Sequence, residues 1–220
     1  MKVSIVNGSP KAKDSTSEQI IRQMVDFLGE SALVQHFHAV QLAREGLSGE
    51  ALVEILKGDA ILFVFPLYVD SLPVSLIKLL SALEAEIGSD SGAKAQIADK
   101  PHVYAVVNCG FFEAKQTTPA VSMIKHFADR TGLSWGYGIG IGGGGMLAAM
   151  SGDWSRGPVA GVYRELSKMA EAIKEKASIP NVFISPGIPR FVYKFAAEFN
   201  MKRYAKQSGA KNIKARPYKQ

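Results

Sequence analysis

The chain has 220 residues, of which 47% are hydrophobic and 21% are charged, as expected of one large domain with a full hydrophobic core. No apolar run approaches the roughly 20 residues of a membrane-spanning helix, and the first residues do not resemble a secretory signal peptide. Cys109 is the only cysteine, which excludes an internal disulfide and a Cys-rich zinc or iron–sulfur site, so no metal centre is expected. A cytoplasmic location follows by default.

The formal net charge of +6 is unevenly distributed along the chain. Residues 190–220 contain nine basic side chains and one acidic side chain, a net charge of +8. The other 189 residues hold 17 basic and 19 acidic groups, a net charge of −2. The basicity therefore belongs to a C-terminal tail, and the main body is not expected to bind nucleic acid.

Apolar runs rich in β-branched residues alternate with segments of helical periodicity along the first 178 residues. One of them, DAILFVFP, is continuously apolar after Asp59, which is typical of a parallel strand buried on both faces. The predicted strands are 2–8, 32–40, 59–66, 102–110 and 133–141. The predicted helices are 15–28, 48–57, 73–87, 117–131 and 158–177.

This alternation predicts an α/β protein with an open, doubly wound sheet. Five strands favour the flavodoxin-like arrangement, a parallel sheet of order 2-1-3-4-5 with helices on both faces. The domain is expected to span residues 1–178, and residues 179–220 are expected to form a Pro-containing linker and a basic amphipathic helical extension. In such a sheet the ligand site lies beyond the carboxyl ends of strands 1, 3 and 4. The loops at this edge are 7–17, 66–73 and 108–117.

The first of these loops, NGSPKAKDSTS, lacks both the P-loop motif and the GxGxxG dinucleotide fingerprint. It offers a tight turn at Gly8, a hydroxyl at Ser9 and three consecutive hydroxyl residues, Ser15–Ser17, at the start of a helix. Free amides and the helix dipole at that position favour a phosphate. Helix capping is the alternative, but one cap residue would suffice for it.

The other two loops contain aromatic residues and rigid or open backbone positions. In FPLYVDSLP, Pro66 ends a strand and Tyr68 offers a flat face, as a flat aromatic cofactor requires; a rigid connector is the alternative. In NCGFFE, Asn108 supplies a donor and an acceptor, and Gly110 permits close approach of a ligand. The two phenylalanines either cover an apolar ligand or pack under the next helix. Cys109 is interpreted as a buried filler rather than a nucleophile.

The order of these three motifs resembles that of the NAD(P)H-dependent FMN reductase and NAD(P)H:quinone reductase superfamily of flavodoxin-like proteins. The resemblance covers residues 1 to about 178, and it implies FMN, less often FAD, as the cofactor. Lys11 stands where many members have arginine. The resemblance implies that Ser9, Ser15, Thr16 and Ser17 surround the terminal phosphate, that Pro66, Leu67, Tyr68 and Val69 line the isoalloxazine, and that Asn108, Cys109, Gly110 and Phe111 close its other edge.

The implied reaction is hydride transfer from NAD(P)H through bound FMN to a quinone or another small acceptor, with Tyr68 as the catalytic candidate that stacks on or hydrogen-bonds the acceptor. A flavodoxin-type electron carrier without direct NAD(P)H oxidation is the alternative. Such carriers are usually strongly acidic, whereas this body is nearly neutral, which favours the enzyme. A cofactor-free interaction protein on the same fold is a third hypothesis.

Three further segments have open interpretations. Gly142–Gly145 either make room for nicotinamide or acceptor, or form a packing loop. Trp154 and Arg156 are candidates to cover a partner subunit's site or to contact an NADPH phosphate. Residues 189–207 are expected to form a helix that docks on its own domain, clasps a homodimer or higher homo-oligomer, or lies peripherally on an anionic membrane.

Overall fold

The computed structural model describes residues 1–11, 14–89, 100–149 and 153–209. The chain divides into two compact units, Met1–Pro186 and Gly187–Gln220. The first unit is built around one β-sheet, and the second contains the helix α8 (Arg190–Gln207). Over the described residues, no helix combines the length and the hydropathy that crossing a bilayer requires.

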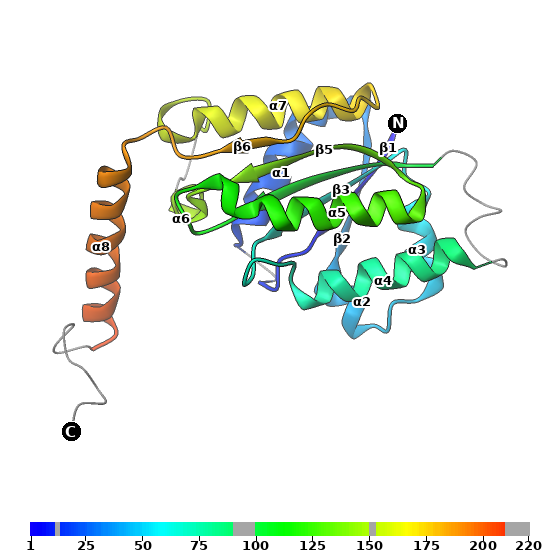
Figure 1. Cartoon of the computed structure of the whole chain (residues 1–220), viewed down its shortest axis with the longest axis horizontal. Helices are drawn as coiled ribbons and strands as arrows, with labels where there is room; N and C mark the ends of the chain where they lie inside the picture. The colour runs from blue at the N-terminus through cyan, green and yellow to red at the C-terminus, as the bar shows by residue number, and fades with distance from the viewer. Residues whose placement is uncertain (12–13, 90–99, 150–152, 210–220) are drawn as a thin grey trace. The chain divides into compact units, whose positions relative to one another are not determined.

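All strands of the sheet are parallel, and their order is β2-β1-β3-β4-β5-β6 (Figure 1). The order of the first five confirms the flavodoxin-like arrangement expected from the sequence. The predicted number of five was wrong, because a sixth strand pairs with β5. The strands are β1 (Lys2–Asn7), β2 (Leu33–His38), β3 (Ala60–Pro66), β4 (His102–Asn108), β5 (Ser134–Ile141) and β6 (Val182–Ile184).

The sixth strand lies inside the segment that the sequence assigned to a linker. It has three residues and is flanked by Pro180 and Pro186, so it is too short for a periodic pattern. The side chain of Asn181 helps to hold it, because Asn181 Oδ1 accepts a hydrogen bond of 2.8 Å from the amide of Gly138 in β5. The first unit therefore runs to Pro186, beyond the expected boundary at residue 178.

Helices cover both faces of the sheet (Figure 1). Helices α1 and α7 pack together on one face, and α2, α3, α4 and α5 lie on the other. The short helices α2 and α6 were not predicted. The helices of this unit are α1 (Thr16–Leu28), α2 (Ala39–Arg44), α3 (Gly49–Leu56), α4 (Val74–Gly88), α5 (Thr118–Thr131), α6 (Gly144–Ala149) and α7 (Ala160–Lys174).

Strand β3 shows why the sheet needs helices on both sides. Successive side chains of a strand point to opposite faces. Ile61, Phe63 and Phe65 belong to the core under α3, α4 and α5, whereas Leu62 and Val64 belong to the core under α1 and α7. All five side chains are fully buried. Both faces therefore contribute to the hydrophobic free energy of folding.

Two tyrosines in the core under α7 differ in how their hydroxyls are satisfied. Tyr104 and Tyr137 meet edge to face, with ring centroids 6.2 Å apart. Tyr104 Oη donates to the carbonyl oxygens of Ala172 and Ala177, both at 3.0 Å. In the described part of the chain, the buried hydroxyl of Tyr137 has no hydrogen-bond partner. Burial raises the pKa of both phenols, that of Tyr104 to about 12.

We therefore expect substitutions of these two hydroxyls to have opposite effects. Tyr137→Phe removes an unsatisfied polar group and should raise the free energy of unfolding by about 1 kcal/mol. Tyr104→Phe removes the hydroxyl donor to the carbonyl oxygens of Ala172 and Ala177, of which Ala172 keeps its bond from the amide of Ala177, and should lower it by about 1 to 2 kcal/mol. Urea unfolding followed by circular dichroism measures both. Equal destabilisation by the two substitutions would contradict the predicted difference.

Candidate functional site

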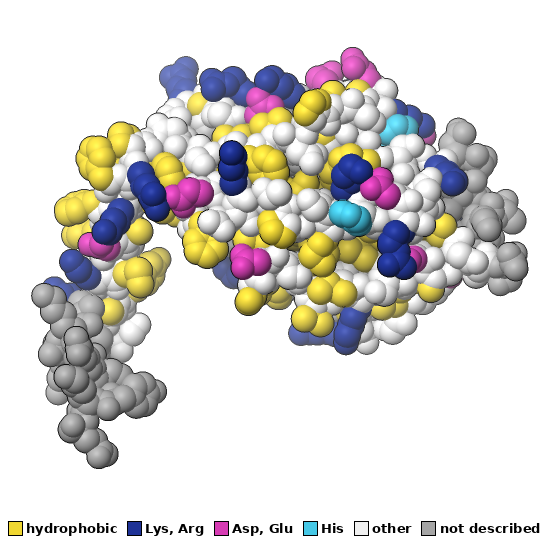
Figure 2. Space-filling model, viewed as in Figure 1, with side chains coloured by type: hydrophobic (Ala, Val, Ile, Leu, Met, Phe, Trp, Pro, Cys, Tyr) yellow, Lys and Arg dark blue, Asp and Glu magenta, His cyan; other side chains and the backbone are white. Residues whose placement is uncertain are grey.

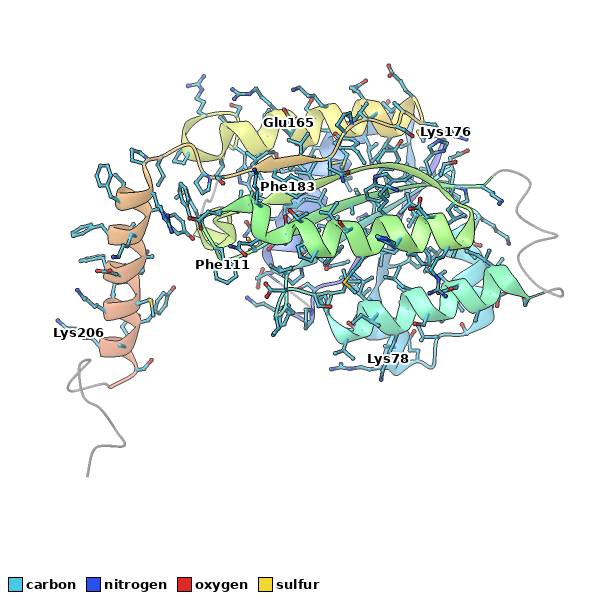
Figure 3. All side chains as sticks on the ribbon, in the orientation of Figure 1. Lys78, Phe111, Glu165, Lys176, Phe183 and Lys206 are labelled. Atoms are coloured by element: carbon cyan, nitrogen blue, oxygen red, sulfur yellow. The ribbon has the colours of Figure 1, made fainter. Side chains whose placement is uncertain are left out.

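The carboxyl ends of the central strands lie level at one edge of the sheet. In the strand register Asn7 pairs with Val64, Pro66 with Asn108, and Asn108 with Ile141. The three predicted loops, 7–17, 66–73 and 108–117, therefore start at this edge. Figure 3 shows Phe111 of the third loop near this end of the sheet and Lys176 near the opposite end.

The first loop is held by the side chain of Asn7 and by the absence of one at Gly8. Asn7 Oδ1 accepts from the amide of Ser9 at 2.9 Å, and Asn7 Nδ2 donates to Glu18 Oε2 at 3.1 Å. A Cβ atom at Gly8 would lie 2.8 Å from Phe65 Cβ, so the chain can pass β3 only with glycine here. The sequence did not single out the roles of Asn7 and Glu18, although an Asn side chain commonly bonds the backbone amide two residues further on.

Three of the predicted phosphate-binding residues are buried serines whose oxygens already accept a hydrogen bond. Ser9 Oγ accepts from the amide of Lys11 at 3.2 Å. Ser15 Oγ accepts from the amide of Glu18 at 3.1 Å, as an N-cap residue does. Ser17 Oγ accepts from Asn108 Nδ2 at 3.1 Å. A hydroxyl also has one proton to donate, and no described residue accepts from these three.

Thr16, the fourth predicted residue, is engaged differently. Its hydroxyl donates to the carbonyl oxygen of Gly144 at 3.3 Å and so ties the start of α1 to α6. The amides of Thr16 and Ser17 occupy the first two helical positions, where a helix has no intrahelical acceptor for them. Thr16 therefore offers an anion its backbone rather than its hydroxyl.

The second loop presents its side chains on a strained turn. Tyr68 and Ser71 exchange backbone hydrogen bonds of 3.0 and 2.9 Å. Between them, Val69 has φ 47° and Asp70 has φ 58°. A β-branched residue in the left-handed region costs of order 1 kcal/mol or more. Val69 is nevertheless 96% exposed and Tyr68 is half exposed, so the turn directs apolar groups outward at this edge.

Asn108, at the start of the third loop, connects all three predicted loops. Its side-chain amide donates to Ser17 Oγ at 3.1 Å and to the carbonyl oxygen of Phe65 at 3.2 Å. The backbone carbonyl oxygen of Asn108 accepts a hydrogen bond from the backbone amide of Leu67 at 2.8 Å. Asn108 is buried, so these bonds are shielded from water. One side chain thus fixes the start of α1 relative to the ends of β3 and β4.

The rest of the third loop combines a buried thiol with an exposed ring. Cys109 is buried, and burial raises the pKa of its thiol, so the group is a poor nucleophile at neutral pH. Phe111 is 56% exposed. A Cβ atom at Gly110 would meet no atom within 4 Å, so the backbone there is open to close approach.

The segment Gly142–Gly145 packs against the third loop. The amides of Gly143 and Gly144 donate to the carbonyl oxygens of Phe111 and Cys109, at 2.6 and 2.7 Å. A Cβ atom would lie 2.2 Å from the carbonyl oxygen of Phe112 if added at Gly142, and 3.0 Å from that of Cys109 if added at Gly144. Backbone packing therefore explains these two glycines. Gly145, by contrast, has open space around it.

The expectation for Trp154 is corrected by the structure. Trp154 is buried in the core under α7, with 4% of its surface exposed, so its ring is not placed to cover a partner's site. Arg156 is exposed, and its Nε atom lies 4.0 Å from Asp153 Oδ2. The local sequence around Trp154, which follows a run of glycines, does not indicate that this residue belongs to the core.

A separate groove of about 280 Å³ lies between α4 and α5. Its floor is apolar, and at its rim Arg130 Nη2 donates to Glu84 Oε1 at 2.5 Å. Figure 2 shows hydrophobic side chains on this face. The groove touches the second loop only through Leu72, so it is distinct from the loops described above. Its lining residues are Leu72, Ile77, Leu80, Ser81, Glu84, Met123, His126, Phe127 and Arg130.

Comparison with known proteins finds likeness in structure but not in sequence. No protein-family model matches the chain, and no curated protein matches it. An NADH:FMN oxidoreductase in its apo form has a TM-score of 0.57 at 16% identity, over 80% of this chain and 90% of that one. An NAD(P)H:quinone oxidoreductase from Methanothermobacter marburgensis has a TM-score of 0.55 at 16% identity, over 80% of this chain and 96% of that one.

A third structure is an FMN-dependent NADH-azoreductase from Bacillus anthracis in complex with FMN. Its TM-score is 0.55 at 12% identity, over 79% of this chain and all of that one. The similar structures also include a flavodoxin. At these identities the likeness establishes the fold. The chain has the flavodoxin-like fold that these oxidoreductases and the flavodoxin share, here with a six-stranded sheet followed by α8.

Proposed function

We propose that this chain is a flavoprotein oxidoreductase that oxidises NAD(P)H and reduces a quinone or another small acceptor, with FMN as its cofactor. One observation carries the proposal: three buried serine hydroxyls around the start of α1 accept hydrogen bonds from the protein, and no residue in the described part of the chain accepts a hydrogen bond from them. The fold of the similar oxidoreductases supports the same conclusion.

The phosphate end of FMN fits this part of the loop. A phosphate oxygen accepts hydrogen bonds only, so it complements hydroxyls whose acceptor role is already filled. The first-turn amides of Thr16 and Ser17 and the dipole of the 13-residue helix α1 add attraction without a charged side chain. Ser9, Ser15 and Ser17 are thus assigned to the phosphate by their hydroxyls, and Thr16 by its amide.

The ring end of FMN fits the other two loops. Tyr68, Val69 and Phe111 are exposed apolar residues that would be covered by a flat ring. Pro66 and Leu67 stiffen the entry to the second loop, and the open backbone at Gly110 admits close contact. Asn108 and the buried Cys109 would act by holding the loop in place rather than by touching the reacting atoms.

When bound, FMN supplies the redox chemistry, which needs few acids or bases from the protein. Tyr68 is assigned to stack on or hydrogen-bond the acceptor. The nearly neutral charge of residues 1–189 favours an enzyme over a flavodoxin-type carrier, because carriers use acidic surfaces to dock on partners. A homodimer or higher homo-oligomer remains a prediction for this protein.

The test is FMN binding followed by anaerobic reduction of the loaded protein. We expect the full chain to quench FMN fluorescence on binding and the bound flavin to bleach when NADH or NADPH is added without oxygen. Adding a quinone should restore the flavin absorbance. Binding without bleaching by either nucleotide would favour the electron carrier. Absence of FMN binding would overturn the flavoprotein assignment altogether.

A further inference from the structure

Helix α8 carries a row of exposed aromatic side chains. Phe191, Phe195 and Phe199 are four residues apart, so they lie on one face of the helix. They are 74%, 75% and 61% exposed, and the helix buries none of its side chains. Figure 2 shows hydrophobic and basic side chains together on its surface. Isolated surface phenylalanines are ordinary, but a contiguous row marks an interaction surface.

Basic side chains follow this row on the same helix. Phe199, Lys202 and Lys206 are three and four residues apart, so the aromatic face continues into a cationic one. Figure 3 labels Lys206 near the end of α8. The helix has five basic residues and one acidic residue, and four more basic residues follow it in the sequence. The rest of the chain has a net charge of −2, so this concentration of positive charge is local.

The aromatic row and the basic residues together restrict the kind of partner that α8 can bind. A nucleic-acid backbone would satisfy the cations but leave the phenylalanines in water. Pairing with α8 of a second copy would bury the phenylalanines but bring two positively charged helices together. An anionic lipid surface satisfies both parts, since its acyl layer accepts aromatic rings and its phosphates attract Lys and Arg.

We propose that α8 binds peripherally to anionic membranes. Phe191, Phe195 and Phe199 enter the boundary between headgroups and acyl chains, and Lys202, Arg203 and Lys206 contact the lipid phosphates. The long stems of these cations can lie along the apolar layer while their charged groups stay in water. The proposal is independent of any activity at the sheet edge.

The test is co-sedimentation of the full chain with lipid vesicles. We expect binding to phosphatidylcholine vesicles that contain phosphatidylglycerol, weaker binding to phosphatidylcholine alone, and release by salt. The triple variant Lys202→Gln/Arg203→Gln/Lys206→Gln should bind about 100-fold more weakly, because each cation contributes about fivefold. The triple variant Phe191→Ala/Phe195→Ala/Phe199→Ala should lose at least tenfold. Alanine and glutamine both favour helix, so α8 is retained.

Matched variants in the first unit are the controls. Arg44→Gln/Lys78→Gln/Lys115→Gln removes the same charge from exposed positions, and Leu33→Ala/Val74→Ala removes exposed apolar groups. Both should bind vesicles like the wild type. Equal losses in the control and α8 variants, or equal binding to neutral and anionic vesicles, would overturn the proposal. Failure of the wild type to bind vesicles would also overturn the proposal. A change in oligomeric mass or in nucleic-acid binding in the α8 variants would then point to the partner that α8 has instead.

Discussion

Ser15→Asp is expected to weaken FMN binding by at least 100-fold while the fold stays as stable as in the wild type. Aspartate caps a helix as well as serine does, so the bond to the amide of Glu18 is retained. A carboxylate at the start of α1 also interacts favourably with the helix dipole. The same carboxylate repels a phosphate, by about 4 kcal/mol for unit charges about 4 Å apart at an intermediate dielectric constant.

The measurement is the dissociation constant for FMN from fluorescence quenching, together with the thermal midpoint of the apoprotein. Ser15→Asn is the matched control, because asparagine has the shape and capping ability of aspartate without its charge. We expect the Asn variant to lose less than tenfold in affinity. If Asp and Asn variants bind FMN equally well, Ser15 is only a helix cap and the phosphate is not at this position.

Gly140→Ala is expected to lower the free energy of unfolding by about 3 kcal/mol. A Cβ atom at Gly140 would lie 2.1 Å from Thr117 Oγ1 and 2.5 Å from Phe183 Cδ1. Thr117 is fixed because its hydroxyl donates to the carbonyl oxygen of Ala114 at 2.7 Å, and Phe183 is in the centre of β6. The methyl group would therefore push β6 and the end of the third loop away from β5.

Urea unfolding of the apoprotein measures this effect, and Gly145→Ala provides the comparison. Gly145 lies in the exposed part of α6, and a methyl group added there would have no neighbouring atom within 4 Å. Alanine should stabilise that helix by up to about 1 kcal/mol. An unchanged unfolding free energy in Gly140→Ala would show that the close contacts at Gly140 relax without cost. An equal fall in both variants would show that the loss does not come from those contacts.

The fold was predictable where the pattern in the sequence was long. Strand β3 is apolar for its whole length, and five runs rich in β-branched residues that alternate with helices predict both the parallel sheet and the order of its first five strands. The three loops at the carboxyl edge followed from that topology. Strand β6 and helix α6 are too short to show a period, and they are held by contacts with residues distant in sequence.

The hydrogen bonds within the candidate site were beyond sequence reasoning for the same reason. Asn108 and Ser17 are 91 residues apart, and nothing in either local sequence indicates that one donates to the other. Thr16 stood beside Ser15 and Ser17 as an equivalent hydroxyl, yet its distant partner Gly144 distinguishes it. Sequence indicated which types of residue gather at the edge, and the fold determines which protons remain free.

The short strand β6 has a consequence for aggregation. A sheet edge exposes unpaired amides and carbonyls that can recruit a strand from another molecule. Only Val182, Phe183 and Ile184 pair with β5, and Pro180 and Pro186 on either side of them have no amide hydrogen to donate. A foreign strand could therefore form few bonds along this edge. The same segment that completes the sheet also limits its growth into intermolecular assemblies at the β6 edge.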